Sequence, residues 1–387
     1  MLRKIIVPAA CVSAMLGISA LAYIYIGGGF VDKPHKDAAP IAEPGKVDDT
    51  HKKADKNPAV ELPAVKRGPT RGVFAIVKPG QEMPPQIVAN PKIKGITLSL
   101  QWDQLNPAEN KFDWKRFDMS LEHCKRFRKE VALEILAGCY TPKWVLDKGV
   151  KLFQFKNVYK YDESTKDQMV SMPLPWDEIY QTEWEKFLNE LGRHCSNREE
   201  VVMAHMTGPT AFTSRMSLPA GKDDLPNWKK SDYSREKLIK AWEKTFDSYL
   251  KAFPDIVLCL TLDTPVIGDD NNILEDIVNL GAERLNGRLA LQSANLQDSK
   301  MYEHFRPQPE FSLLAKNSGK LVIGLRQGVV GYESSPKPGL TLGNIKNAVE
   351  FGMQFSPAYF EIYIIDILKT ADLLDFVNKQ FNDSEKK

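Results

Sequence analysis

Side chains able to carry out chemistry gather where short apolar runs end in this 387-residue sequence. They are Trp102, Asp103, Tyr140, Trp144, His205, Thr207, Asp263, Arg326 and Gln327, and Glu361 lies inside the last of these runs. Aromatic rings stack on the apolar faces of a sugar, and polar groups beside them bind its hydroxyls. We therefore expect a carbohydrate ligand, with the alternative that Trp102 and Trp144 are core residues at a rim.

The expected site contains stacking rings, hydroxyl-binding groups and acids. Trp102 and Trp144 are expected to stack on sugar rings, and His205 and Gln327 to bind hydroxyls. The other substrate-binding candidates are Tyr140, Thr207, Arg215 and Arg326. Two of Asp263, Glu361 and Asp103 are the expected catalytic acids; other acids near the same runs are Asp269, Asp270, Glu333 and Asp366.

Two glutamates lie inside apolar runs rather than at their ends. Glu134 interrupts VALEILAG and Glu361 interrupts YFEIYIID. An unpaired charge in such a place costs several kcal/mol, so each is expected to face a polar interior with a partner such as Arg326. Charged groups of this kind are often functional, and a purely structural ion pair is the alternative.

Eight short β-branched runs supply the elements that must position these side chains. They are residues 72–77, 95–100, 131–138, 201–206, 256–262, 288–294, 320–327 and 359–366. Amphipathic helical patterns lie between most of them, for example 113–130, 176–195, 235–253 and 342–353. Buried strands that alternate with helices predict a parallel sheet closed as a (β/α)8 barrel, whose site lies at the carboxyl ends of the strands. An open doubly wound sheet is the alternative, but KPGQEMPP after the first run lacks a phosphate-binding glycine motif.

The N-terminus predicts a membrane segment. Residues 5–29 follow the basic start MLRK and carry no charge. This uncharged run is long enough to form a membrane-spanning helix. Tyr23 and Tyr25 favour an uncleaved anchor, and Arg3 and Lys4 place the remainder outside the cytoplasm. We expect a signal anchor at 1–30, a disordered linker at 31–69 and one barrel domain at 70–383. The protein is then membrane-anchored and extracytoplasmic, in the periplasm or at the cell surface, or secreted if the segment is cleaved.

Composition argues against several other classes. Lysine and arginine number 52 against 50 acidic residues, a balance that does not suit a nucleic-acid binder. The five cysteines show no CxxC pair, and His205 has no nearby companion at metal-ligand spacing. We expect no metal, no cofactor and no nucleic-acid partner.

Three segments resemble barrel glycoside hydrolases of the β-galactosidase type, in the clan A superfamily. GITLSLQWDQLNPAENKFDWKRFD is similar to the family's second strand and its loop, with Asn110 where glycine is usual. VALEILAGCYTPKWV resembles the third strand with its Pro-x-Trp loop, and MPLPWDEIYQTEWEKFLNELG the approach to the fourth. The resemblance covers roughly residues 72–380 and implies a (β/α)8 fold, O-glycosyl hydrolysis and no organic cofactor.

The sequence departs from that family where its catalytic glutamates belong. Retaining members carry an acid/base glutamate at the end of strand four and a nucleophilic glutamate at the end of strand seven. Here strand four ends in His205-Met206-Thr207, the following loop carries Arg215 at a possible carboxylate position, and strand seven ends in Arg326-Gln327. Two hypotheses follow: a glycoside hydrolase with displaced carboxyl groups, and a catalytically inactive carbohydrate-binding pseudoenzyme.

Overall fold

Eight parallel strands form a closed barrel in this computed structural model, which describes residues 66–157, 167–265, 272–299, 309–334 and 341–384. Around the barrel the order is β1-β10-β9-β8-β7-β6-β3-β2. The strands are β1 (Gly72–Val77), β2 (Ile93–Gln101), β3 (Glu130–Leu136), β6 (Val201–His205), β7 (Val257–Leu262), β8 (Leu289–Leu296), β9 (Val322–Gln327) and β10 (Tyr359–Tyr363). The predicted (β/α)8 barrel is confirmed, and each predicted strand falls on one of these eight.

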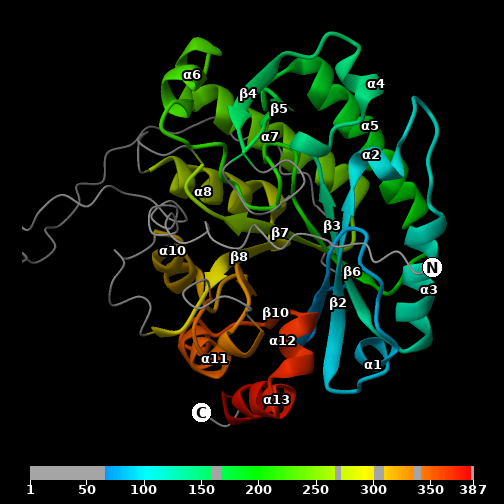
Figure 1. Cartoon of the computed structure of the whole chain (residues 1–387), viewed down its shortest axis with the longest axis vertical. Coiled ribbons are helices and arrows are strands. Elements are labelled where there is room, and N and C mark those ends of the chain that lie inside the picture. Colours follow the sequence, from blue (N-terminus) through cyan, green and yellow to red (C-terminus); the bar gives the residue numbers. More distant parts are fainter. Residues whose placement is uncertain (1–65, 158–166, 266–271, 300–308, 335–340, 385–387) are drawn as a thin grey trace, which may run out of the picture. The chain divides into compact units, whose positions relative to one another are not determined.

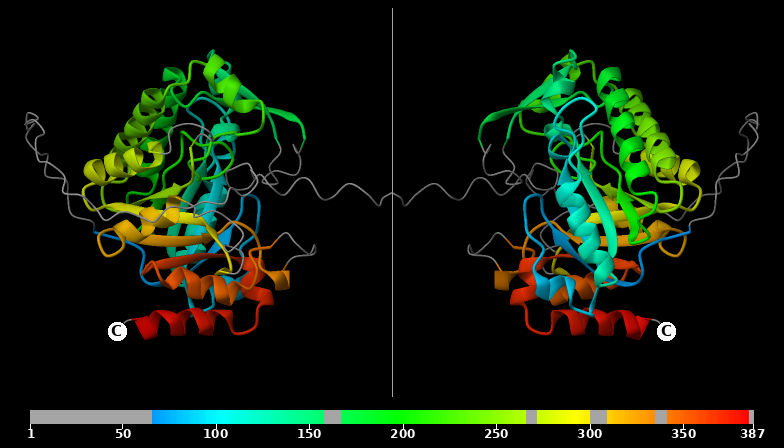
Figure 2. Two further views of the ribbon diagram at one scale, coloured as in Figure 1. Left: turned by 90° about the vertical axis from the view of Figure 1, so that its left-hand side faces the viewer. Right: turned by 90° about the vertical axis from the view of Figure 1, so that its right-hand side faces the viewer.

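Helices follow the strands and cover the outside of the barrel, as α3, α5, α7 and α8 do in Figure 1. The helices are α1 (Pro85–Val88), α2 (Trp102–Leu105), α3 (Lys115–Arg126), α4 (Lys143–Leu146), α5 (Glu178–His194), α6 (Asp224–Lys230), α7 (Arg235–Ala252), α8 (Ile273–Leu285), α10 (Pro309–Asn317), α11 (Ile345–Met353), α12 (Ile364–Lys369) and α13 (Leu373–Ser384). Short turns η1 (Gly138–Tyr140) and η3 (Tyr332–Ser334) follow β3 and β9. Helix α13, red in Figure 2, packs against β1 and α11.

Local features of the sequence explain where helices begin and which face they bury. Asp177 and Ser234 accept hydrogen bonds from the first-turn backbone N–H groups of α5 and α7, which caps both helices. In α3 one face is buried through Phe117, Leu121 and Cys124, which lie at helical spacing. The antiparallel hairpin of β4 (Leu152–Lys156) and β5 (Met169–Pro173), inserted between β3 and α5, was not predicted.

The barrel interior changes from apolar to polar along the strands. Because side chains two residues apart point to the same face of a strand, five strands present an interior pair. These pairs are Ala132 and Glu134, Met203 and His205, Cys259 and Thr261, Ala290 and Gln292, and Tyr359 and Glu361, all buried. The second, polar member always lies nearer the carboxyl end, so the polar groups occupy the half of the barrel where a site is expected.

The N-terminal segment of the described chain is attached to the opposite end of the barrel. The backbone N–H groups of Lys66 and Arg67 donate to the carbonyl of Asp255, and Arg67 forms a parallel bridge with Ile256. Within the described residues no helix has the length and apolar character needed to cross a bilayer. The predicted anchor at 1–30 and most of the predicted linker lie outside those residues, as do Asp269 and Asp270.

Candidate functional site

An ion-pair network fills the polar half of the barrel interior. Arg326 Nη1 donates to Glu134 Oε1 at 2.6 Å and to Glu361 Oε2 at 3.2 Å, and Nη2 donates to Glu134 Oε2 at 3.1 Å. His205 Nε2 lies 2.8 Å from Glu361 Oε1. The prediction that both glutamates face the interior with Arg326 as a partner is therefore confirmed.

Strand register brings this network together, and neutral donors complete it. Glu134 is the register partner of Ser99 on β2 and of His205 on β6, and Glu361 is the partner of Arg326 on β9. The neutral donors are Ser99 and Ser214 to Glu134, and Thr97 (2.7 Å) and Gln292 (2.9 Å) to Glu361. Each buried carboxylate therefore has partners for both of its oxygens, as a buried charge requires.

The four charges of the network balance one another. Burial alone would raise the pKa of Glu134, but Arg326 and His205 lower it to about 2. Against the same burial, His205 and Arg326 also lower the pKa of Glu361. Burial disfavours the imidazolium of His205, yet the Glu361 carboxylate raises its pKa well above the ordinary value. At neutral pH the network is two anions facing two cations.

This network engages both Glu361 and His205, and the roles expected of them at a ligand stay predictions. Neither side chain has any exposed surface. A glutamate held as an anion by His205 and Arg326 has no proton to give a leaving group, and it has no face open to a substrate. Glu361 and His205 thus form a buried ion pair, and a structural ion pair is the alternative that the sequence left open for Glu361.

Three other predicted substrate-binding residues are buried and make contacts within the protein. Trp102 is 0% exposed and packs edge-on against Trp184 with ring centroids 4.9 Å apart, so its ring belongs to the core. The Thr207 hydroxyl donates to the carbonyl of Ile135. Gln327 is also 0% exposed. Its Nε2 donates a hydrogen bond to Asp366 Oδ2 (3.0 Å), and its Oε1 accepts one from the backbone N–H of Tyr363 (2.7 Å). The expected contacts of these three residues with a sugar stay predictions.

A second polar cluster lies at the carboxyl ends of β7 and β8, and we call Arg215, Asp263, Asn295 and Glu310 the rim cluster. Arg215 Nη1 donates to Asn295 Oδ1 at 2.6 Å and lies 3.5 Å from Asp263 Oδ2. Asn295 Nδ2 donates to Glu310 Oε1 at 2.5 Å. The loop after β6 brings Arg215 here, because Met216 N–H donates to Thr261 on β7. The guanidinium at the possible carboxylate position thus pairs with a carboxylate.

The two carboxyl groups of the rim cluster differ in environment. The Asp263 side chain is 22% exposed and sits beside the Arg215 cation. Glu310 is buried in the first turn of α10; burial and the nearby charge of Asp263 raise its pKa to about 7. Sequence reasoning missed Glu310 because it opens a helix instead of ending a strand, and only its place after β8 could have suggested it.

Three predicted residues stand on other parts of the same rim. Asp103 is exposed in the first turn of α2, three strands from Asp263 around the barrel. Trp144 is half-buried in α4, where its indole N–H donates to the carbonyl of Asn106 at 2.9 Å. Tyr140 in η1 is half-buried, edge-on to Phe212. The two rings keep surface that a ligand could contact.

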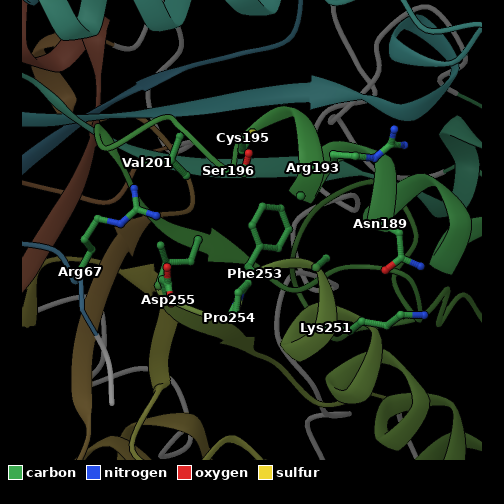
Figure 3. Close-up of a pocket in the computed structure, with 13 residues that line it drawn as sticks. Arg67, Asn189, Arg193, Cys195, Ser196, Val201, Lys251, Phe253, Pro254 and Asp255 are labelled. Atoms are coloured by element: carbon green, nitrogen blue, oxygen red, sulfur yellow. The ribbon is translucent and has the colours of Figure 1, made fainter. Parts of the chain in front are cut away.

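A cavity of about 330 Å³ lies at the opposite end of the barrel, between the ends of α5 and α7 (Figure 3). In Figure 3 Arg67 and Lys251 lie on opposite sides of the Phe253 ring. Arg67 donates to the carbonyl of Arg198 at 2.7 Å, and Lys251 pairs with Glu185 at 3.1 Å. This end of a (β/α)8 barrel serves stability, so the cavity is not the candidate site.

Among the described residues no group of acidic, histidine or cysteine side chains could hold a metal ion.

Comparison with known proteins supports the resemblance read from the sequence. Residues 86–265 match the family model described as a β-galactosidase, which confirms the similarity to barrel glycoside hydrolases of that type. No curated protein matches the sequence.

Solved structures that resemble this chain include several carbohydrate-active enzymes, and the first of them shares its fold. The catalytic domain of β-amylase from Paenibacillus polymyxa is similar with a TM-score of 0.51 and 10% identity, over 83% of this chain and 99% of that chain. A β-galactosidase from Bacillus circulans sp. alkalophilus has a TM-score of 0.48 and 11% identity, over 76% of this chain and 50% of that chain. Xylanase 10B from Thermotoga maritima has a TM-score of 0.48 and 11% identity, over 82% and 97%.

Proposed function

We propose that this protein hydrolyses O-glycosidic bonds of an oligosaccharide or glycan at the carboxyl ends of its barrel strands. The observation that carries the proposal is the partly exposed Asp263 carboxylate at that rim, held beside Arg215 in a chain with a family match to β-galactosidase. Glycoside cleavage passes through an oxocarbenium-like transition state, which a carboxylate stabilises. Asp263 is the working carboxylate, and Tyr140 and Trp144 offer rings on which a sugar stacks.

The protein acts outside the cytoplasm, attached to a membrane through residues 1–30. The uncharged run 5–29 after a basic start supports this placement. Fractionation of expressing cells, with protease added to intact and to permeabilised cells, tests it. Recovery of the barrel in the cytoplasmic soluble fraction would rule it out.

A second function is favoured by the ends of β6 and β9. His205 and Thr207 at one strand end, and Arg326 and Gln327 at the other, stand where related hydrolases carry glutamates, and all four are engaged in hydrogen bonds. A barrel that lost both of those acids could bind glycan without cleaving it. This alternative is a carbohydrate-binding pseudoenzyme on the same rim.

Turnover and binding measured on the same full-length protein separate the two functions. Reducing-sugar release from a panel of glycans and aryl glycosides is expected for the hydrolase. Titration calorimetry that detects glycan binding, with no release from any substrate, would instead establish the pseudoenzyme. Crystals soaked with small oligosaccharides would contradict both functions if sugar occupied another part of the molecule and left the rim empty.

A further inference from the structure

Lys78 is a cation at the mouth of the barrel, where the carboxyl ends of the strands meet, and no role described so far uses it. It directly follows β1, and Phe74 on that strand packs in the barrel interior against Tyr359 of β10. Because side chains at even spacing share one face of a strand, Lys78 and Tyr363 both belong to the interior side of the mouth. The Lys78 ammonium accordingly lies over the Tyr363 ring, 4.3 Å from its centroid.

The Lys78 ammonium has no acid bonded to it. Lys78 is exposed, and none of the described acidic side chains forms an ion pair with it. Desolvation, followed by the charge of Arg326, lowers the pKa of Lys78 and outweighs the opposite effect of Asp366. The Asp366 carboxylate is itself buried, and it accepts hydrogen bonds from Gln327 and from the backbone N–H of Gly331. An anion from outside the chain would therefore stabilise this ammonium.

Tyr363 joins Lys78 to the rim cluster. The Tyr363 hydroxyl donates to the carbonyl of Gly328 at 3.5 Å. Arg215 Nη2 lies so close to Gly328 that a Cβ atom at that glycine would come within 2.5 Å of it. Arg215 in turn faces the carboxylate of Asp263. Lys78 and the Tyr363 ring are thus part of the same rim as the proposed working carboxylate.

The neighbouring cations of this rim differ from Lys78 in having acidic partners. Arg326 donates to Glu134 and Glu361, and only 12% of its side chain is exposed. Arg215 lies 3.5 Å from Asp263 and is 8% exposed. Lys78 instead presents an exposed ammonium with three N–H donors, and the Tyr363 ring helps to hold it in place through a cation–π contact.

Resting on the function proposed above, we propose that the glycan bound at this rim is acidic and that Lys78 binds its negatively charged group. That group is the carboxylate of a uronic acid or a sulfate ester, since both accept charge-assisted hydrogen bonds from an ammonium. Lys78 then determines substrate specificity, while Asp263 remains the working carboxylate.

Sugars that differ only in charge test this role. Full-length wild type, Lys78→Gln and Lys78→Arg are titrated by calorimetry with neutral oligosaccharides and with their uronate and sulfated counterparts of the same linkage. We expect the wild type to bind an acidic sugar about tenfold or more tightly than its neutral counterpart. Lys78→Gln should lose this difference, and Lys78→Arg, which keeps the charge, should retain most of it. Preference for the uronates would identify a carboxylate as the bound group, and preference for the sulfated sugars a sulfate.

Lys320→Gln is the matched control, because Lys320 is also an exposed lysine and lies just before β9 at the opposite end of the barrel. It should keep the wild-type preference, and urea unfolding should show that both glutamine variants are folded. Neutral sugars bound as tightly as acidic ones, or an unchanged preference in Lys78→Gln, would overturn the role of Lys78 and leave the proposed function standing. A wild type that neither binds nor cleaves any of the sugars would overturn the proposed function itself.

Discussion

The imidazole of His205 and the carboxylate of Glu361 meet at 2.8 Å although their strands, β6 and β10, lie four positions apart in either direction around the barrel. The pair therefore spans the barrel interior, and Arg326 joins it to Glu134. Related hydrolases would place a catalytic glutamate at the end of the strand that carries Arg326. Here that strand end supplies a cation to the network, and the proposed function assigns the chemistry to the partly exposed Asp263 instead.

Removing the Glu361 charge should destabilise the fold severely. Glu361→Gln leaves His205 and Arg326 facing one anion in place of two, and breaking a buried pair costs about 3–5 kcal/mol. The free energy of unfolding in urea at pH 7 measures this cost. Glu82→Gln, at an exposed position, should change it by less than about 0.5 kcal/mol. Equal stability of the two variants would show that the network contributes little.

His205 should make stability depend on pH in the neutral to alkaline range. Its folded pKa is raised, so its stabilisation is complete below the unfolded pKa of about 6.5 and is lost as the pH rises through the higher folded value. Unfolding free energies measured from pH 6 upward should decline in the wild type and decline less in His205→Gln. The exposed His123→Gln should keep the wild-type slope. Parallel curves for the wild type and His205→Gln would contradict the ion pair.

Glu310 should also make the free energy of unfolding depend on pH, in a lower pH range than His205. Its pKa is about 7 in the folded state, so the folded protein holds an extra proton between the unfolded value near 4.3 and 7. Stability should therefore fall as the pH rises through that window, by on the order of 3 kcal/mol. Glu310→Gln should lack this fall, which urea titrations at pH 4.5 and 7.5 would reveal. A fall of the same size in the variant would mean that Glu310 ionises normally.

Trp102 and Trp144 should respond differently to replacement by alanine. Trp102→Ala removes a fully buried ring and should cost about 3–5 kcal/mol of unfolding free energy. Trp144→Ala should cost less stability but weaken glycan binding by about 1 kcal/mol, roughly fivefold in Kd. Urea unfolding and titration calorimetry measure the two effects. Unchanged glycan affinity in Trp144→Ala would remove this ring from the binding surface.

The sequence allowed the barrel to be predicted more closely than its site. The strands can be identified from eight buried apolar runs with amphipathic helical patterns between them, because the spacing of apolar residues distinguishes strands from helices. The polarity of Glu134 inside an apolar run also indicated a buried partner, and Arg326 is that partner. A strand end, however, looks alike in sequence whether its side chain faces the outer core, the interior or solvent, which is why Trp102, His205 and Gln327 were expected at the ligand. Glu310 lies at the start of a helix, and its environment is created only when β7 and β8 lie side by side.

Hydrolysis by Asp263→Asn tests the central claim most directly. Initial rates of reducing-sugar release are measured for the full-length wild type, for Asp263→Asn and for Asp255→Asn, whose side chain lies at the opposite end of the barrel and pairs with Lys66. We predict turnover in the wild type and in Asp255→Asn, and a loss of about 100-fold or more in Asp263→Asn with its fold intact. Turnover that survives in Asp263→Asn would place the chemistry elsewhere, and no turnover in any of the three proteins would mean that this barrel does not hydrolyse glycosides.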